Sequence, residues 1–411
     1  MKRRILLAAF AMFGLVSNAQ TPATVTMGQG YANQVYFKFA TGAMNSYAHN
    51  SWDVAFYRAA PMDMGIRVND AKVTQLYEVG TNAAWSTVNV ADQDAWLPLY
   101  NSDAVWKTGA FDEGSAPYGW GSYNPVTHHV SGSRVFVMEY AGEIYKKIKI
   151  DDYFGGYTFT YSNWDGTTWS ADTTQTIANG SADRFFNYFN LTTNEEVVAE
   201  PATGEWDMVF TKYYTDYPFG NETVKYNVTG VLHHPEVMVS QNEEVSGMPE
   251  NPVMNYEAGI NVIGYDWKTL SGMSYVVNSD RAFYVKTPED AVYRLIFNTI
   301  STGSQGGVIT FNYQDVTALL ANEQFENKVS FGIYPNPSPD KHISIVYDGA
   351  NANAINNVSI FSLTGAKVYD KKLQNNGFAN AELNLSNLNA GVYILKFESG
   401  AYSTTKKIVL Q

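Results

Sequence analysis

An internal duplication constrains the fold of this chain more than any other feature of its 411 residues. Four sequence blocks recur in the same order about 150 residues later, and their spacing drifts only slightly, as loop insertions between fixed strands would produce. The clearest pair is Trp52-Asp53-Val54-Ala55-Phe56 and Trp206-Asp207-Met208-Val209-Phe210. The other three pairs begin at Tyr36 and Tyr188, at Arg134 and Arg281, and at Tyr157 and Ile309. The duplication predicts two copies of one fold.

The repeated blocks alternate between two faces, as strands do. From Trp52 to Arg58, the side chains of Trp52, Val54 and Phe56 share one side. This spacing is typical of half-buried β-strands, and the intervals between blocks are rich in Gly, Pro, Asn and Asp with no long helical period. A content of 29 Tyr, 22 Phe and 9 Trp also favours strands. We therefore predict an all-β protein with two tandem antiparallel β-units of about 130 residues, each closing its own core.

The C-terminal region differs from the duplicated part in the length and spacing of its apolar runs. A Pro-rich segment, Phe331 to Pro337, leads into short and evenly spaced apolar runs that predict an Ig-like β-sandwich. The chain then divides into a signal peptide at 1–19, unit 1 at 20–165, a linker rich in Thr, Ser and Asn at 166–184, unit 2 at 185–317, a second linker at 318–330 and the sandwich at 331–411.

The first residues predict export from the cytoplasm. Three cations, Lys2, Arg3 and Arg4, precede the apolar run Ile5 to Val16, which is too short to span a bilayer. Small residues typical of a signal-peptidase site follow before Gln20. We expect a secreted protein with no transmembrane segment. The net charge of −13 opposes nucleic-acid binding, and the absence of cysteine excludes disulfides, thiolate metal sites and cysteine nucleophiles.

Residues 331–411 resemble the C-terminal sorting domain of the type IX secretion system. The resemblance rests on Tyr334-Pro335-Asn336-Pro337, on Gly391-Val392-Tyr393 and on Lys406-Lys407 in the last predicted strand. It implies export of a folded cargo to the outer-membrane surface or the medium. It also implies the secretion machinery and its sortase as partners, with outer-membrane polysaccharide as the attachment point after sorting.

The duplicated unit resembles the HmuY-type family of haem-binding surface proteins, whose members are all-β. The resemblance rests on Tyr36 to Gly42, on the two Trp-Asp blocks, on Ala282 to Thr287 and on Gly307 to Phe311. It implies haem as a candidate cofactor. Because the matching residues belong to predicted strands, whereas the iron ligands of that family lie in loops, the resemblance concerns the fold more than the ligand.

A haem site would need two axial donors and a flat apolar slot. The candidate donors are His128, His129 and Met273, with Met254 as a further thioether. Adjacent side chains of an extended strand point to opposite faces, so at most one of His128 and His129 would bind unless a turn intervenes. The aromatic residues that precede them could wall a flat ligand or stack on a sugar ring: Tyr118, Trp120 and Tyr123.

Sequence motifs of enzymes are missing from the chain. It contains no Gly-x-Ser-x-Gly elbow, no His-Glu-x-x-His pair and no phosphate-binding glycine loop, and no pattern identifies a metal site. We therefore expect a non-enzymatic binding protein at the cell surface or in the medium, with haem as the leading ligand. The alternative is a glycan-binding or adhesive surface protein that uses the same aromatic loop.

Overall fold

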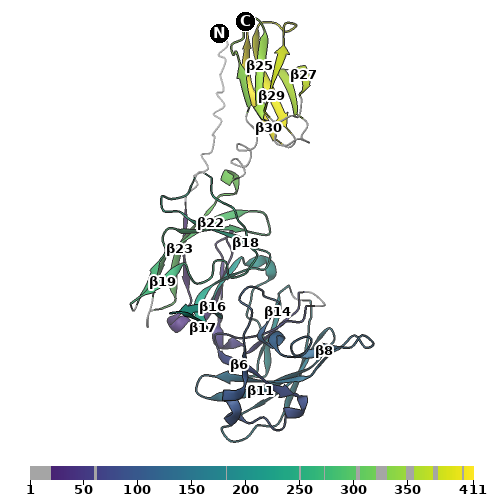
Figure 1. Ribbon diagram of the computed structural model, residues 1–411, viewed down its shortest axis with the longest axis vertical. Helices are drawn as coiled ribbons and strands as arrows, with labels where there is room; N and C mark the ends of the chain where they lie inside the picture. Colours follow the sequence, from purple (N-terminus) through teal and green to yellow (C-terminus); the bar gives the residue numbers. More distant parts are fainter. Residues whose placement is uncertain are drawn as a thin grey trace, which may run out of the picture. The chain divides into compact units, whose positions relative to one another are not determined.

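The computed structural model describes residues 20–59, 63–181, 183–249, 251–272, 274–301, 306–320, 331–348, 356–373, 378–399 and 402–411. They belong to two compact units, and the boundary between the units in the sequence lies between Asp315 and Val316. Each is built almost entirely from antiparallel strands (Figure 1), which confirms the all-β prediction. The predicted signal peptide at 1–19 and most of the predicted linker at 318–330 lie outside the described residues.

Two large sheets with matching strand orders form most of the first unit. One has the order β13 (Thr173–Ala178), β12 (Gly156–Asn163), β11 (Ile144–Tyr153), β10 (Arg134–Tyr140), β6 (Val73–Thr81) and β7 (Leu97–Leu99), with β8 (Gly121–Tyr123) and β9 (Val130–Gly132) beside it. The other has the order β1 (Thr21–Thr26), β23 (Val308–Asp315), β22 (Val292–Ile300), β21 (Arg281–Lys286) and β18 (Met238–Glu243). The repeated blocks that begin at Arg134 and Arg281, and at Tyr157 and Ile309, thus occupy corresponding positions in the two sheets.

Three smaller sheets complete this unit. Their orders are β15 (Glu195–Val197), β14 (Phe186–Asn190), β4 (Val54–Tyr57), β5 (Ile66–Val68); β17 (Glu222–His233), β16 (Met208–Phe219), β2 (Asn33–Phe37), β3 (Met44–Ala48); and β19 (Lys268–Ser271), β20 (Ser274–Val277). Helix is confined to one α-helical turn at 317–320 and to the 3-10 turns η1 (Gln29–Tyr31), η2 (His49–Ser51), η3 (Asn82–Ala84), η4 (Val90–Ala95), η5 (Ala110–Glu113) and η6 (Thr203–Glu205), within the described part of the chain. None of the helices described there could cross a membrane.

The two copies exchange their first strands. β1 pairs with β23 at the end of the second copy, while β13 pairs with β12 at the end of the first. β2 pairs with β16, and β14 pairs with β4, in the same reciprocal way. We call the assembly of β4 to β15 lobe 1, and β1 to β3 together with β16 to β23 lobe 2.

The exchange overturns two expectations from the sequence. Each copy does not close its own core, so the lobes differ from the repeat units 20–165 and 185–317. The predicted linker at 166–184 contains β13, a strand of the lobe 1 sheet. The physical reason is that matching strands carry the same alternation of side chains and the same backbone donors, so a strand of either copy fits either sheet.

The aspartates of the repeated Trp-Asp block fasten the exchanged segments. Asp207 accepts a hydrogen bond of 2.7 Å from the backbone N–H of Phe39, which lies just past β2. Asp53 accepts one of 2.7 Å from the N–H of Leu191, just past β14. Each carboxylate is fully buried and is ion-paired with a lysine at 2.9 or 2.8 Å, Lys38 or Lys72. The repeated Trp-Asp block therefore both reveals the duplication and stabilises the exchanged segments in their new positions.

Three hydrophobic clusters fill the first unit: one in lobe 1, one in lobe 2 and one between the lobes. β4 is buried on both faces, because Val54 and Phe56 point into the core of lobe 1 while Ala55 and Tyr57 join the cluster between the lobes. The prediction of a half-buried strand is wrong here. The small sheets of the two lobes both contribute to the third cluster, which covers the second face of the strand.

The second unit is a small β-sandwich around its own core, as predicted from its evenly spaced strands. Its sheets have the orders β24 (Phe331–Tyr334), β25 (His342–Asp348), β28 (Phe378–Asn384) and β27 (Lys367–Leu373), β26 (Asn356–Ser362), β29 (Gly391–Ser399), β30 (Tyr402–Leu410).

Candidate functional site

The two adjacent histidines lie in the connection between β8 and β9 rather than in a strand. His128 adopts a left-handed backbone conformation with φ 61°, so a turn does intervene between its side chain and that of His129. The Nδ1 atom of His128 is 2.6 Å from the hydroxyl of Tyr123. The Nδ1 atom of His129 is 2.7 Å from the carboxylate of Asp152 on β11. Each imidazole is thus oriented by a different partner.

A cleft of about 560 Å³ lies beside this connection, and we call it the aromatic cleft. It is lined by Tyr123 and His128 together with aromatic, apolar and polar residues that the sequence did not single out. These are Arg58, Ala59, Met64, Val130, Tyr153, Phe154, Gly155, Asn179 and Gly180. Predicted and unpredicted residues therefore meet in one cleft of lobe 1.

Phe154 is the most exposed aromatic residue of this cleft. It lies in the turn between β11 and β12, and 63% of its surface is exposed. The imidazole of His129 stacks on its ring, with centroids 4.4 Å apart and planes inclined by 4°. Because Asp152 holds that imidazole, the Phe154 ring has a fixed backing. The sequence signal that could have revealed it is an aromatic residue directly before Gly155-Gly156 in a predicted hairpin turn.

Tyr118 and Trp120 do not join the aromatic cleft. They line a separate hollow of about 260 Å³ with Asp63 and Lys107. Trp120 is fully buried and belongs to the core of lobe 1, so its role is packing. The aromatic loop predicted from the sequence is therefore divided between two places, and only Tyr123 reaches the histidines.

The remaining candidate donors are spread over the chain. Met273 lies outside the described residues, and Met254 is half-buried in a segment without strand structure. Burial lowers the pKa of His49 and His234 to about 4, and it also lowers the pKa of His233. These buried imidazoles are neutral at physiological pH. Within the described part, no three His, Asp or Glu side chains gather as a metal site.

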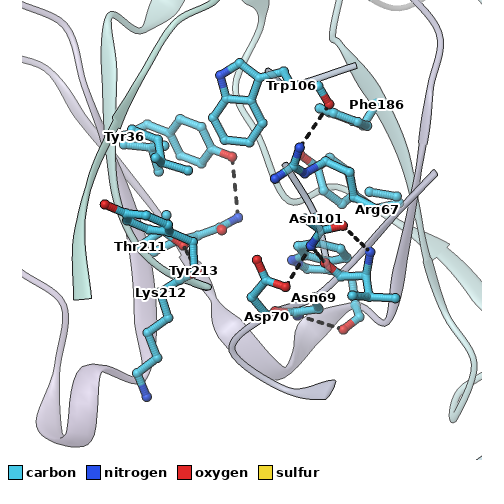
Figure 2. Close-up of a pocket in the computed structure, with 17 residues that line it drawn as sticks. Tyr36, Arg67, Asn69, Asp70, Asn101, Trp106, Phe186, Thr211, Lys212 and Tyr213 are labelled. Atoms are coloured by element: carbon cyan, nitrogen blue, oxygen red, sulfur yellow. Dashed lines mark hydrogen bonds between the residues drawn. The ribbon is translucent and has the colours of Figure 1, made fainter. Parts of the chain in front are cut away.

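A small cavity of about 40 Å³ lies between the lobes (Figure 2). The Arg67 guanidinium donates hydrogen bonds of 2.8 to 3.2 Å to the carbonyls of four residues, Ser102, Val105, Trp106 and Thr108. Asn101 donates to Asp70 at 2.7 Å, and burial raises the pKa of Asp70 to about 6. The Lys212 side chain extends away from the cavity. A space of this size holds water rather than an organic ligand, so we assign these polar groups to the packing of the lobes.

The residues predicted to carry the sorting signal join the two ends of the second unit. The side chain of Asn336 donates to the Lys407 carbonyl at 2.8 Å and accepts from the Val409 N–H at 2.9 Å. Tyr334 and Asn336 each precede a proline, Pro335 or Pro337, in a cis peptide bond. Lys406 donates to the Phe331 carbonyl at 3.1 Å, and Tyr393, two residues after Gly391, donates to the Asn389 carbonyl at 3.0 Å. The first segment of the unit is thereby bound to its last strand.

Comparison with known proteins supports one of the two resemblances. Residues 332–411 match the model of the family described as "Secretion system C-terminal sorting domain". A search of curated proteins found no match to the chain. The HmuY-type resemblance of the duplicated unit has no family match behind it. The chain thus ends in a type IX secretion C-terminal sorting domain, which directs its export to the cell surface.

Proposed function

We propose that this protein is a non-enzymatic, surface-exposed binding protein whose aromatic cleft takes a sugar ring. The observation that carries the proposal is the Phe154 ring, which is exposed, backed by His129 and part of the cleft wall. An exposed aromatic ring held in one orientation costs little conformational entropy when a ligand packs on it. Because the protein is exported, a fixed aromatic ring beside an open cleft could bind a ligand from outside the cell.

The chemistry of the cleft matches the two kinds of surface on a sugar. The faces of a sugar ring carry C–H groups, which pack on aromatic faces, while its edge carries hydroxyl groups that donate and accept hydrogen bonds. Aromatic faces are supplied by Phe154 and Tyr123, and hydrogen-bonding groups by His128, Asn179 and Arg58. Apolar walls with a few polar groups are the usual composition of a small-molecule site.

Replacement of Phe154 by Ala tests the proposal. The protein is first screened against arrayed neutral and acidic oligosaccharides, and the strongest hit is then measured by calorimetry. We expect Phe154→Ala to weaken binding about three- to tenfold, the range that one aromatic contact supplies. Phe219→Ala is the matched control, because Phe219 is 72% exposed near the end of the β16–β17 hairpin in lobe 2. Equal affinities of both variants and the wild type would refute the proposal.

Haem capture is the second candidate, and one observation favours it. An imidazole, His128, and a thioether, Met64, line the same cleft, and these are the two donor types that haem iron takes as axial ligands. Tyr123 contacts Nδ1 of His128, which leaves Nε2 for a metal. Iron bound in this way would supply the ligand's anchoring bond, and the aromatic residues of the cleft would hold the macrocycle.

Titration with haemin separates this candidate from the first. A sharp Soret band at one equivalent, weakened in His128→Ala and in Met64→Leu, is the expected result for haem binding. His342→Ala is the control, because His342 lies in the sorting domain and its side chain is half-exposed. An absorption spectrum that is the sum of free haemin and protein would eliminate haem as the ligand.

A further inference from the structure

The hollow that contains Tyr118 adjoins the aromatic cleft. Met64, a buried residue of the lobe 1 core, lines both of them. We call this hollow of about 260 Å³ the Tyr118 hollow. Strand β8 provides a second connection, because Tyr123 at its end lines the aromatic cleft and Tyr118 lies just before its start. Five residues of fully extended chain span at most roughly 18 Å, so one short oligosaccharide can reach both side chains.

A rigid turn presents Tyr118 to the hollow. Ala116 and Gly119 exchange backbone hydrogen bonds of 3.0 and 2.8 Å around it, and its own N–H donates to the Gly121 carbonyl at 3.0 Å. Gly119 has a φ of 70°, and a Cβ there would lie 2.3 Å from the Asp112 carbonyl oxygen, so the turn sits directly against η5. Tyr118 is 41% exposed, and its backbone does not have to be ordered when a ligand packs on the ring.

The polar groups of the Tyr118 hollow can bind hydroxyl groups. Asp112 accepts hydrogen bonds at Oδ2 from the N–H groups of Gly109 at 2.6 Å and Ile66 at 3.1 Å. These bonds orient the carboxyl group and leave Oδ1 to accept from a ligand. Asp63 and Lys107 form an ion pair at 3.3 Å, with side chains 33% and 53% exposed. Because an exposed ion pair is worth little, both of its members can turn to a hydroxyl at small cost.

The charges of the hollow favour a neutral ligand. Two acidic residues, Asp63 and Asp112, line it together with one cation, Lys107. The hollow therefore offers no excess of positive charge to a carboxylate or a phosphate, and its acidic groups would repel either one. Hydroxyl groups, in contrast, can donate to carboxylates and accept from an ammonium group.

The size of the hollow indicates that it holds only part of a ligand. Small-molecule pockets usually enclose about 300–1,000 Å³. The aromatic cleft, at about 560 Å³, lies within this range, whereas the Tyr118 hollow, at about 260 Å³, lies below it. One ring at the end of a longer ligand suits the smaller space.

We propose that the aromatic cleft and the Tyr118 hollow are neighbouring subsites for one neutral oligosaccharide. One ring packs on Phe154, and a further ring packs on Tyr118. The Asp112 carboxyl group and the Asp63–Lys107 pair bind the hydroxyls of the further ring. Rings whose substituents are all equatorial suit both subsites best, because their two faces carry only C–H groups for aromatic contact. The inference rests on the proposed function, to which it adds the class of ligand, a neutral chain of more than one ring.

The test measures the binding of glucose and of cello-oligosaccharides of up to six rings to the full chain by calorimetry. These probes are neutral, and all their ring substituents are equatorial. We expect the affinity to rise about three- to tenfold at the length that first reaches the Tyr118 hollow, since one aromatic contact supplies that much. Tyr118→Ala should remove this gain and leave the affinity of the shorter probes unchanged, whereas Tyr118→Phe, which keeps the ring face, should retain most of it. Tyr226→Ala is the matched control, because Tyr226 on β17 in lobe 2 is 55% exposed.

The possible results separate the two proposals. If the affinity does not depend on chain length while Phe154→Ala weakens binding of every probe, the sugar site stands and the Tyr118 subsite is refuted. If longer chains bind more tightly but Tyr118→Ala keeps the gain, another surface holds the further ring and the subsite is again refuted. If no cello-oligosaccharide binds while the array shows another sugar, the assignment to neutral equatorial rings fails. A lack of any sugar binding overturns both proposals.

Discussion

Removal of the Asp53 carboxylate should destabilise the first unit as a whole. This fully buried group accepts hydrogen bonds from the Leu191 N–H at 2.7 Å and the Tyr140 hydroxyl at 2.9 Å, and it pairs with Lys72 at 2.8 Å. Asp53→Ala leaves all three donors without their acceptor. Truncating one partner of a buried ion pair costs about 3–5 kcal/mol. With a urea slope of about 3 kcal/mol per M, the unfolding midpoint should fall by about 1–1.7 M.

Tryptophan fluorescence is the appropriate probe, because the 9 tryptophans all lie between Trp52 and Trp267. The signal therefore reports the first unit and not the sorting domain. Asp216→Ala is the control, since that carboxylate is exposed and its ion pair is worth less than about 1 kcal/mol. A midpoint shift in Asp53→Ala no larger than in Asp216→Ala would refute the stabilising role of the Asp53 carboxylate. A cycle with Lys72→Met should show a coupling above about 1 kcal/mol.

Three further outcomes are expected. Glu200→Gln should raise the free energy of unfolding at pH 8 by up to about 3 kcal/mol and leave it nearly unchanged at pH 4. Burial raises the pKa of Glu200 to about 7, so the stability that the neutral carboxyl group contributes is lost as pH rises through that value. Urea titrations at both pH values check this. Gly132→Ala should lower the melting temperature and loosen the His128 connection, because a Cβ there would lie 1.5 Å from the Ile150 carbonyl oxygen; an unchanged melting temperature would contradict the packing. Asn336→Ala should speed hydrogen exchange in β30 of the full chain and reduce the secreted fraction, and unaltered exchange would show that its two hydrogen bonds are dispensable.

The sequence predicted the strands well and their partners poorly. Alternation identified the blocks at Trp52 and Trp206, and both begin strands at corresponding places, β4 and β16. The exchange escaped prediction because Val35 pairs with Phe210, a contact between copies, whereas alternation only states which side chains share a face. Pairing between copies is a property of the connections, and the pattern within each strand does not encode it.

The candidate site was predicted in part. His128 and Tyr123 are in contact, as their proximity in sequence suggested, but Trp120 is part of the core. Phe154 and Arg58 were missed because they reach the cleft from separate connections that only the assembled sheets bring together. The terminal sandwich was predicted most completely, since its motif residues both define a family and contact one another within residues 332–411.

The reciprocal exchange of β1 and β2 for β13 and β14 also determines how the molecule can be divided. A fragment ending at residue 165 would lack the strands that flank β12 and β4, and would leave their edges open to other chains. Two separate single-copy chains would have to meet as a swapped dimer, at a rate and stability that depend on their concentration. Covalent fusion of the copies makes that encounter intramolecular, so a cargo diluted outside the cell keeps its fold.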